Sequence, residues 1–163
     1  MKAIKTVKLK KITVNMRKKS FLVETKHLAY EFPFSRLEVV PAFEDPVVKL
    51  KPEPGFEGFT YTLKSGKEGY IIWDQVLDYN KDPDYEHDML LFELTCRALD
   101  IIKQRKIKKR EIARRLKTSP AHLYRLLDTT FYGKTIDQMI RLLRALDYHV
   151  EFILKDNFLK KAA

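Results

Sequence analysis

The hydrophobic periodicity of the chain changes near residue 88, and this change limits the possible folds more than any other feature. Before that point apolar residues alternate with a period of two, as in residues 12–16 and 59–63, which is typical of half-buried strands. After it they recur every three or four residues, as on the buried face of a helix. The sequence therefore predicts an α+β fold, with a small antiparallel β domain over residues 1–80 and a helical domain over residues 88–155.

Short alternating segments in the first half predict the strands. The alternation slips by one residue at Lys10–Lys11, which indicates a β-bulge. Residues 25–27 favour a tight turn, and the glycine-containing residues 64–69 favour a hairpin loop. The predicted strand segments are residues 7–9, 12–16, 21–23, 28–32, 59–63 and 70–73.

Three further stretches have their own patterns. Four prolines and two glycines in residues 41–58 are expected to break any long element. The polar residues 78–87 are typical of a linker into the helical half. Residues 148–154 alternate again and predict a C-terminal strand, which could join the sheet or pair with a second subunit.

The helical half carries several helix-start signals. Asp88 is predicted to cap a long helix, and Thr135 to cap the last one. Ser119 precedes Pro120, so it can cap a helix in which proline takes the first position, where a missing N–H has no consequence. The residues predicted to face inward are Leu91, Leu94, Ala98, Ile102, Ile112, Ala113, Leu116, Leu123, Leu126, Ile136, Met139, Ile140, Leu143 and Leu146.

Charge is distributed in blocks of one sign. The formal net charge is +10. Residues 2–19 hold eight Lys or Arg and no acid, whereas residues 74–93 hold seven acids and one lysine. Residues 97–125 hold eleven Lys or Arg against Asp100 and Glu111, a local charge of +9. Such blocks often mark interaction surfaces, and a basic one favours a polyanionic partner.

The strongest basic block coincides with a motif. Residues 112–126, Ile-Ala-Arg-Arg-Leu-Lys-Thr-Ser-Pro-Ala-His-Leu-Tyr-Arg-Leu, place the small Ala113 where two helices would cross. This segment resembles the lambda-repressor/Cro-like helix-turn-helix family, and residues 135–146 are similar to the closing helix of that family. The resemblance covers about residues 88–147 and implies binding to double-stranded DNA. The N-terminal β domain falls outside it, and its combination with such a helical domain is similar to uncharacterised or antitoxin-like bacterial regulators.

Two positions depart from the family pattern. The turn between the helices usually holds glycine, whereas here it holds Lys117, which would have to adopt a left-handed conformation. Pro120 and Ala121 fall where the family presents polar base-reading side chains. DNA shape is therefore expected to contribute much of the specificity.

The resemblance assigns a role to each candidate site residue. Arg125 is the expected base-reading residue, because a guanidinium can bind guanine through two hydrogen bonds; the alternative is a surface ion pair with Asp128. His122 and Tyr124 could contact bases or phosphates, or be ordinary exposed side chains. Ser119 and the start of its helix could receive a phosphate, and the remaining basic residues would hold the DNA backbone. The predicted DNA-binding residues are Lys108, Lys109, Arg110, Arg114, Ser119, Ala121, His122, Tyr124 and Arg125.

Other classes of function find little support. No P-loop, nucleophile-elbow or dinucleotide-binding motif is present, so neither an enzyme nor a cofactor is expected. The acids around His87 could bind a divalent ion, but a solvated linker is the simpler interpretation. The single cysteine, Cys96, rules out a disulfide framework. No apolar run is long enough for a signal peptide or a membrane span, so a cytoplasmic protein is expected.

The sequence thus predicts a transcriptional regulator that binds an operator as a homodimer, since one such module covers a half-site. The main alternative is an antitoxin-like module that neutralises a toxin-like partner protein. A single-stranded RNA binder is disfavoured, because no aromatic-rich basic strand motif of that class is present. The β domain could serve in dimerisation, in binding a protein, or in sensing a ligand.

Overall fold

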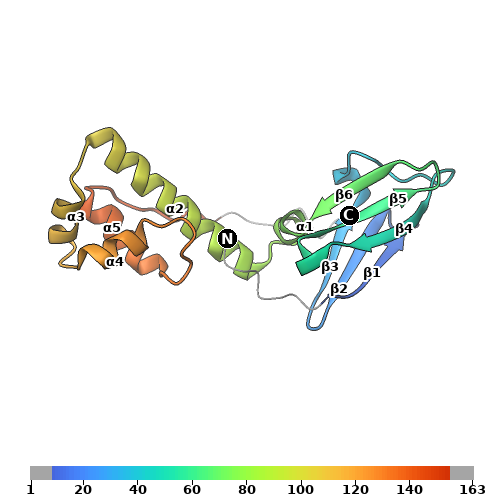
Figure 1. Ribbon diagram of the computed structural model, residues 1–163, viewed down its shortest axis with the longest axis horizontal. Coiled ribbons are helices and arrows are strands. Elements are labelled where there is room, and N and C mark those ends of the chain that lie inside the picture. Colours follow the sequence, from blue (N-terminus) through green and yellow to red (C-terminus); the bar gives the residue numbers. More distant parts are fainter. Residues whose placement is uncertain (1–8, 155–163) are drawn as a thin grey trace. The chain divides into compact units, whose positions relative to one another are not determined.

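A computed structural model describes residues 9–154 of the chain. The fold is α+β and divides into two compact units, Met1–Leu90 and Leu91–Ala163. Figure 1 shows the strands of the first unit and the helices of the second. Within the described residues, no helix is long and apolar enough to cross a membrane.

The first unit contains two three-stranded antiparallel sheets, with strand orders β1-β2-β3 and β4-β5-β6. Two single-turn 3-10 helices, η1 (Phe34–Arg36) and η2 (Pro54–Phe56), lie beside these strands in the sequence. The strands are β1 (Leu9–Asn15), β2 (Ser20–Thr25), β3 (Ala29–Pro33), β4 (Val47–Pro52), β5 (Gly58–Leu63) and β6 (Glu68–Ile72).

Most of the local strand predictions are confirmed. The register of β1 against β2 shifts between Leu9 and Lys11, where the alternation slips in the sequence. The turn after Thr25 is closed by hydrogen bonds between Thr25 and Leu28. The hairpin β5–β6 has its predicted loop, and residues 7–8 of the first predicted segment lie outside the described residues.

Strand β4 was not expected among the prolines. It begins after Pro46, ends at Pro52 and occupies an edge of its sheet, with a register shift between Val47 and Lys49. A proline cannot donate to a strand ladder, but at the end of an edge strand this donor is not needed. The prolines therefore delimit this strand instead of abolishing it.

Aromatic side chains fill much of the core of the first unit. Phe21, Phe59 and Tyr61 are fully or almost fully buried, and the Phe21 ring lies within 5.4 Å of the other two ring centroids. Trp73, predicted to end a strand, is the first residue of helix α1 (Trp73–Asn80) and is buried between Tyr30 and Phe56.

The linker predicted over residues 78–87 is wrong, because α1 and α2 (Pro83–Arg105) occupy most of it. Asp82 accepts a hydrogen bond from the backbone N–H of Tyr85 at 3.0 Å, and Pro83 follows as the first helical residue. Asp88, predicted to cap this helix, lies inside it. A capping acid followed by proline is a strong helix start, so the cap of α2 is Asp82 and not the Asp88 that the apolar periodicity indicates.

The second unit packs helices around a single core (Figure 1). Most residues predicted to face inward are buried, although Leu94, Ile102, Leu116, Ile136 and Ile140 are only half-buried. The buried Ile101, Leu127 and Leu142 were not predicted. Besides the C-terminal part of α2, the helices are α3 (Lys109–Arg115), α4 (Pro120–Leu126) and α5 (Ile136–Ala145).

The C-terminal strand predicted over residues 148–154 is absent from the described structure. After α5, Tyr148 donates its N–H to the carbonyl of Leu143, and Val150 packs against the helical core. Phe152, Ile153 and Leu154 are exposed. A strand needs a neighbouring strand to satisfy its backbone, and this segment pairs with none of the six described strands. Residue 155 of the predicted domain lies outside the described residues.

Candidate nucleic-acid interface

Helices α3 and α4 are joined by a tight turn at Lys117. Lys117 adopts a left-handed conformation with φ of 52°, as its place in the sequence requires. Its N–H donates to the carbonyl of Arg114 at 3.1 Å, and the N–H of Thr118 donates to the carbonyl of Ala113 at 3.0 Å. These two bonds form a Schellman motif, which ends α3 and directs the chain into α4.

Ser119 caps α4 as predicted. Its Oγ accepts a hydrogen bond from the N–H of His122 at 3.1 Å, and Pro120 takes the first helical position. The hydroxyl still has its own proton, since capping uses only a lone pair. Ser119 is exposed, so its hydroxyl can donate a hydrogen bond to an incoming ligand.

One face of α4 is buried and the opposite face is open to solvent. Leu123 and Leu126 are at most 3% exposed and belong to the helical core. Ala121, Tyr124 and Arg125 are exposed, as predicted, whereas His122 is half-buried. The exposed face of α4 thus offers one guanidinium, one phenol ring and a small side chain that leaves room for a close approach.

A cation–π contact links the two helices. The ammonium nitrogen of Lys109, at the start of α3, lies 4.6 Å from the centroid of the Tyr124 ring. Lys108 and Arg110, on either side of Lys109 in the sequence, are also exposed. Among residues 9–154, none of these three cations forms an ion pair.

Arg125 also lacks an ion pair within the described part of the chain. The carboxylate of Asp128, its alternative partner, instead accepts hydrogen bonds from the N–H and hydroxyl of Thr130 at 2.8 and 2.7 Å. These bonds hold the pKa of Asp128 below its usual value. The guanidinium of Arg125 is therefore available to an external acceptor.

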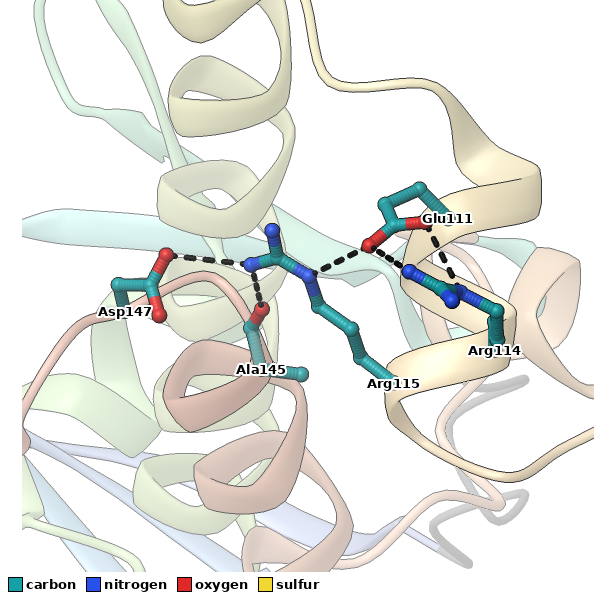
Figure 2. A network of polar contacts seen from close by, with 5 residues as sticks. All are labelled: Glu111, Arg114, Arg115, Ala145 and Asp147. Atoms are coloured by element: carbon teal, nitrogen blue, oxygen red, sulfur yellow. Dashed lines mark hydrogen bonds and ion pairs between the residues drawn. The ribbon is translucent and has the colours of Figure 1, made fainter.

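Figure 2 shows that two other arginines are already engaged. Arg114 donates through Nε and Nη2 to the two carboxylate oxygens of Glu111, at 3.1 and 2.8 Å. Arg115 donates to Glu111 through Nε, and through Nη1 to the carbonyl of Ala145 and to Asp147, each at 3.1 Å. Hydrogen bonds, first that from Arg114 and next in importance that from Arg115, lower the pKa of Glu111.

These contacts separate the roles of neighbouring arginines. Arg114 is a predicted backbone-contacting residue; its side chain is 78% exposed and its Nη1 is not used by Glu111. Arg115 instead fastens α3 to the end of α5. The spacing of Glu111 from Arg114 and Arg115, three and four residues, could have revealed the pairing on one helix. Nothing local in the sequence indicates Ala145 and Asp147.

Lys134 is a structural residue that the sequence analysis missed. It is 4% exposed, and its ammonium donates to the carbonyls of Leu126 and Asp128 at 3.1 and 2.6 Å. Burial lowers its pKa. A cation at the carbonyl end of a helix is favourable, so Lys134 stabilises the C-terminal end of α4 and the loop that follows.

No group of three or more His, Cys, Asp or Glu side chains suited to a metal ion occurs within residues 9–154. Near the start of α2, the Nδ1 atom of His87 lies 3.2 Å from the carboxylate of Asp88. This histidine–acid contact is exposed and involves two residues only.

Comparison of the chain with known protein families, with curated proteins and with solved structures finds no match. The function must therefore be inferred from the geometry and charge of the chain itself.

Proposed function

We propose that the protein binds double-stranded DNA through α3 and α4, which would act as a helix-turn-helix, and that it regulates transcription from an operator site. The observation that carries this proposal is the exposed face of α4, which presents Arg125 and the Tyr124 ring that Lys109 of α3 contacts. A helix about 10–12 Å wide fits the major groove of B-DNA. The buried Leu123 and Leu126 fix which face of α4 the groove would meet.

Each side chain has a role suited to its surroundings. Arg125 would bind a base edge, since its guanidinium is not held by any carboxylate of the described chain. Lys108, Lys109 and Arg110 would contact phosphates, which position the protein without reading sequence. Arg114 would add a phosphate contact through its unused nitrogen.

An operator would be recognised by two copies of the chain. A single α3–α4 pair spans a half-site, and dimers of such modules bind half-sites about 34–36 Å apart. Analytical ultracentrifugation of the protein with and without a selected operator tests this expectation. A single copy bound per operator would contradict it.

The central test compares Arg125→Ala with Arg144→Ala, a control that removes an equal charge from an exposed position on α5. A preferred duplex is first selected from a random pool. Arg125→Ala should cost about 1–3 kcal/mol on that duplex and relax the preference at one base pair. It should cost much less on random duplex DNA.

Two results would contradict the proposal. Equal losses on selected and random duplex would mean that Arg125 contacts phosphate and does not read a base. Absence of duplex binding by the wild-type chain at about 50 mM salt would exclude the DNA-binding function altogether, because electrostatic attraction is strongest at low salt.

A further inference from the structure

Among the described residues of the first unit, the turn between β1 and β2 carries the densest set of cations without an ion pair. Residues 16–19 form this turn, and Arg17, Lys18 and Lys19 are consecutive and exposed. None of the three forms an ion pair within the described residues. The DNA-binding role proposed for α3 and α4 does not use them.

The backbone of this turn is fixed by specific contacts. The side-chain oxygen of Asn15 accepts a hydrogen bond from the N–H of Lys18 at 3.0 Å, and Met16 packs against the core of the first unit. Lys19 adopts a left-handed conformation with φ of 52°. Holding three like charges together on an ordered turn is unfavourable in the free protein and becomes favourable when a polyanion neutralises them.

A fourth cation belongs to the same corner of the unit. The carbonyl of Lys19 accepts a hydrogen bond from the N–H of Phe34 at 2.8 Å, which holds η1 against the turn. The exposed Arg36 lies at the end of η1. Of the nearby carboxylates, Glu31 accepts a hydrogen bond from Ser20 at 2.6 Å. Burial, and then the charge of Glu38, raise the pKa of Tyr61. Both acids are exposed, yet neither forms an ion pair with these cations.

Lys11, at the other end of β1, is in a different situation. Lys11 stands directly opposite Glu24 in the β1–β2 ladder, so its charge faces an acid on the neighbouring strand. The three consecutive cations of the turn have no such acid opposite them in the β1–β2 ladder.

We propose that Arg17, Lys18, Lys19 and Arg36 form a second phosphate-binding surface, through which the first unit holds the backbone of the same duplex DNA. This inference rests on the proposed function of α3 and α4. The surface offers charge and no base-reading geometry, so it strengthens binding to every sequence alike. Because both units belong to one chain, a weak contact by the turn raises the overall affinity through effective concentration.

The test uses the full chain with Arg17→Gln, Lys18→Gln and Lys19→Asn combined. Asparagine is chosen at position 19 because it tolerates the left-handed conformation. The control combines Lys49→Gln, Lys51→Gln and Lys64→Gln, which removes the same charge from other exposed positions of the same unit. Circular dichroism and the melting temperature establish that both variants fold.

The turn variant should reduce the slope of log affinity against log salt by about 2–3 units, since each lost phosphate contact removes about 0.9. Its ratio of affinities for selected and random duplex should stay at the wild-type value. The control should change the slope by less than about one unit. Bound DNA should also protect Lys18 and Lys19 from acetylation and leave Lys49 and Lys51 reactive.

Equal slopes for the turn variant and the control would overturn this inference and leave the proposed role of α4 intact. So would a turn variant that keeps wild-type DNA binding and loses binding to phosphatidylserine vesicles, because the partner of the turn would then be a membrane. If the wild-type chain bound no duplex at all, both the proposed function and this inference would fail.

Discussion

The guanidinium of Arg115 and the carboxylate of Asp147 form an ion pair 3.1 Å long across 32 residues of sequence. The same Nη1 atom donates to the carbonyl of Ala145, so one side chain joins α3 to the end of α5. This contact fixes the helix that carries Lys109 and Arg110. It also removes Arg115 from the set of arginines available to a ligand.

Replacing Arg115 by methionine should lower the melting temperature and reduce DNA affinity less than Arg125→Ala does. The substitution removes the hydrogen bond to the Ala145 carbonyl and two ion pairs, but it keeps an apolar side chain of similar length. Arg141→Met is the matched control, because within residues 9–154 the ion pair of Arg141 is with Asp137 on its own helix. Equal melting temperatures for the two variants would show that the link to α5 adds nothing to stability.

The hydrogen bonds from Arg114 and Arg115 to Glu111 should stabilise the folded protein in a way that is lost in acid. Their hydrogen bonds lower the pKa of Glu111 in the folded protein. A carboxyl group with a depressed folded pKa stabilises the fold above its unfolded pKa, about 4.3, and this contribution is lost as the pH falls through the folded value. Urea unfolding between pH 7 and pH 3 should therefore show wild type more stable than Glu111→Gln at pH 7. The free energies of unfolding of the two proteins should converge towards pH 3. A difference that stayed constant with pH would show that it does not arise from ionisation of Glu111.

Lys117→Gly should stabilise the helical unit by about 1 kcal/mol, because glycine adopts left-handed φ values without the steric penalty of a side chain. Lys106→Gly should do the same, since Lys106 has a φ of 53°. Lys103→Gly is the opposite control: it lies inside α2, where glycine should destabilise by about 0.5–1 kcal/mol. Thermal or urea unfolding measures all three changes, and a destabilising Lys117→Gly would show that the turn depends on the lysine side chain.

Lys134→Met should destabilise the protein by about 2 kcal/mol, because the carbonyls of Leu126 and Asp128 lose a charged donor. The effect should appear in urea unfolding. Lys103→Met, at an exposed position, should change stability by less than about 0.5 kcal/mol. If both variants were equally stable, the buried ammonium would contribute no net stability.

Lys109→Ala should weaken binding to all duplexes alike and reduce the salt slope by about one unit. It also removes the cation that lies over the Tyr124 ring. Tyr124→Leu separates the two effects, because it removes the ring and keeps the Lys109 charge. A Lys109→Ala variant that lost affinity only for the selected duplex would instead assign Lys109 to base recognition.

Several features of the candidate site follow from the sequence because they depend on neighbouring residues. The cap formed by Ser119 before Pro120 and the cap at Thr135 are local hydrogen bonds, so their residues indicate where α4 and α5 begin. The left-handed Lys117 also follows from its place between two helices. The exposed positions of Ala121, Tyr124 and Arg125 follow from the spacing of Leu123 and Leu126.

Other local signals were outweighed or misinterpreted. Asp82 followed by Pro83 is a local signal for the start of a helix. The polar composition of residues 78–87 nevertheless favoured a linker, and Asp88 was predicted as the cap. Strand β4 is bounded by Pro46 and Pro52, and its existence depends on pairing with β5. Propensity alone cannot predict an edge strand of this kind, because its stabilising partner is another strand.

The sequence by itself determined the α+β class, the change from strands to helices, the caps of α4 and α5 and the position of the basic block, since periodicity, capping and charge act over a few residues. Only the tertiary structure decided which cations are engaged and which are free. Arg115 and Lys134 bind carbonyls that the fold brings to them, whereas Arg125 forms no ion pair within residues 9–154. Tertiary structure also decided the conformation of residues 148–154. Their alternating pattern permits a strand, but no described strand pairs with them. A hydrogen bond needs both of its partners, and the distance between partners remote in sequence is set by the packing of the whole unit.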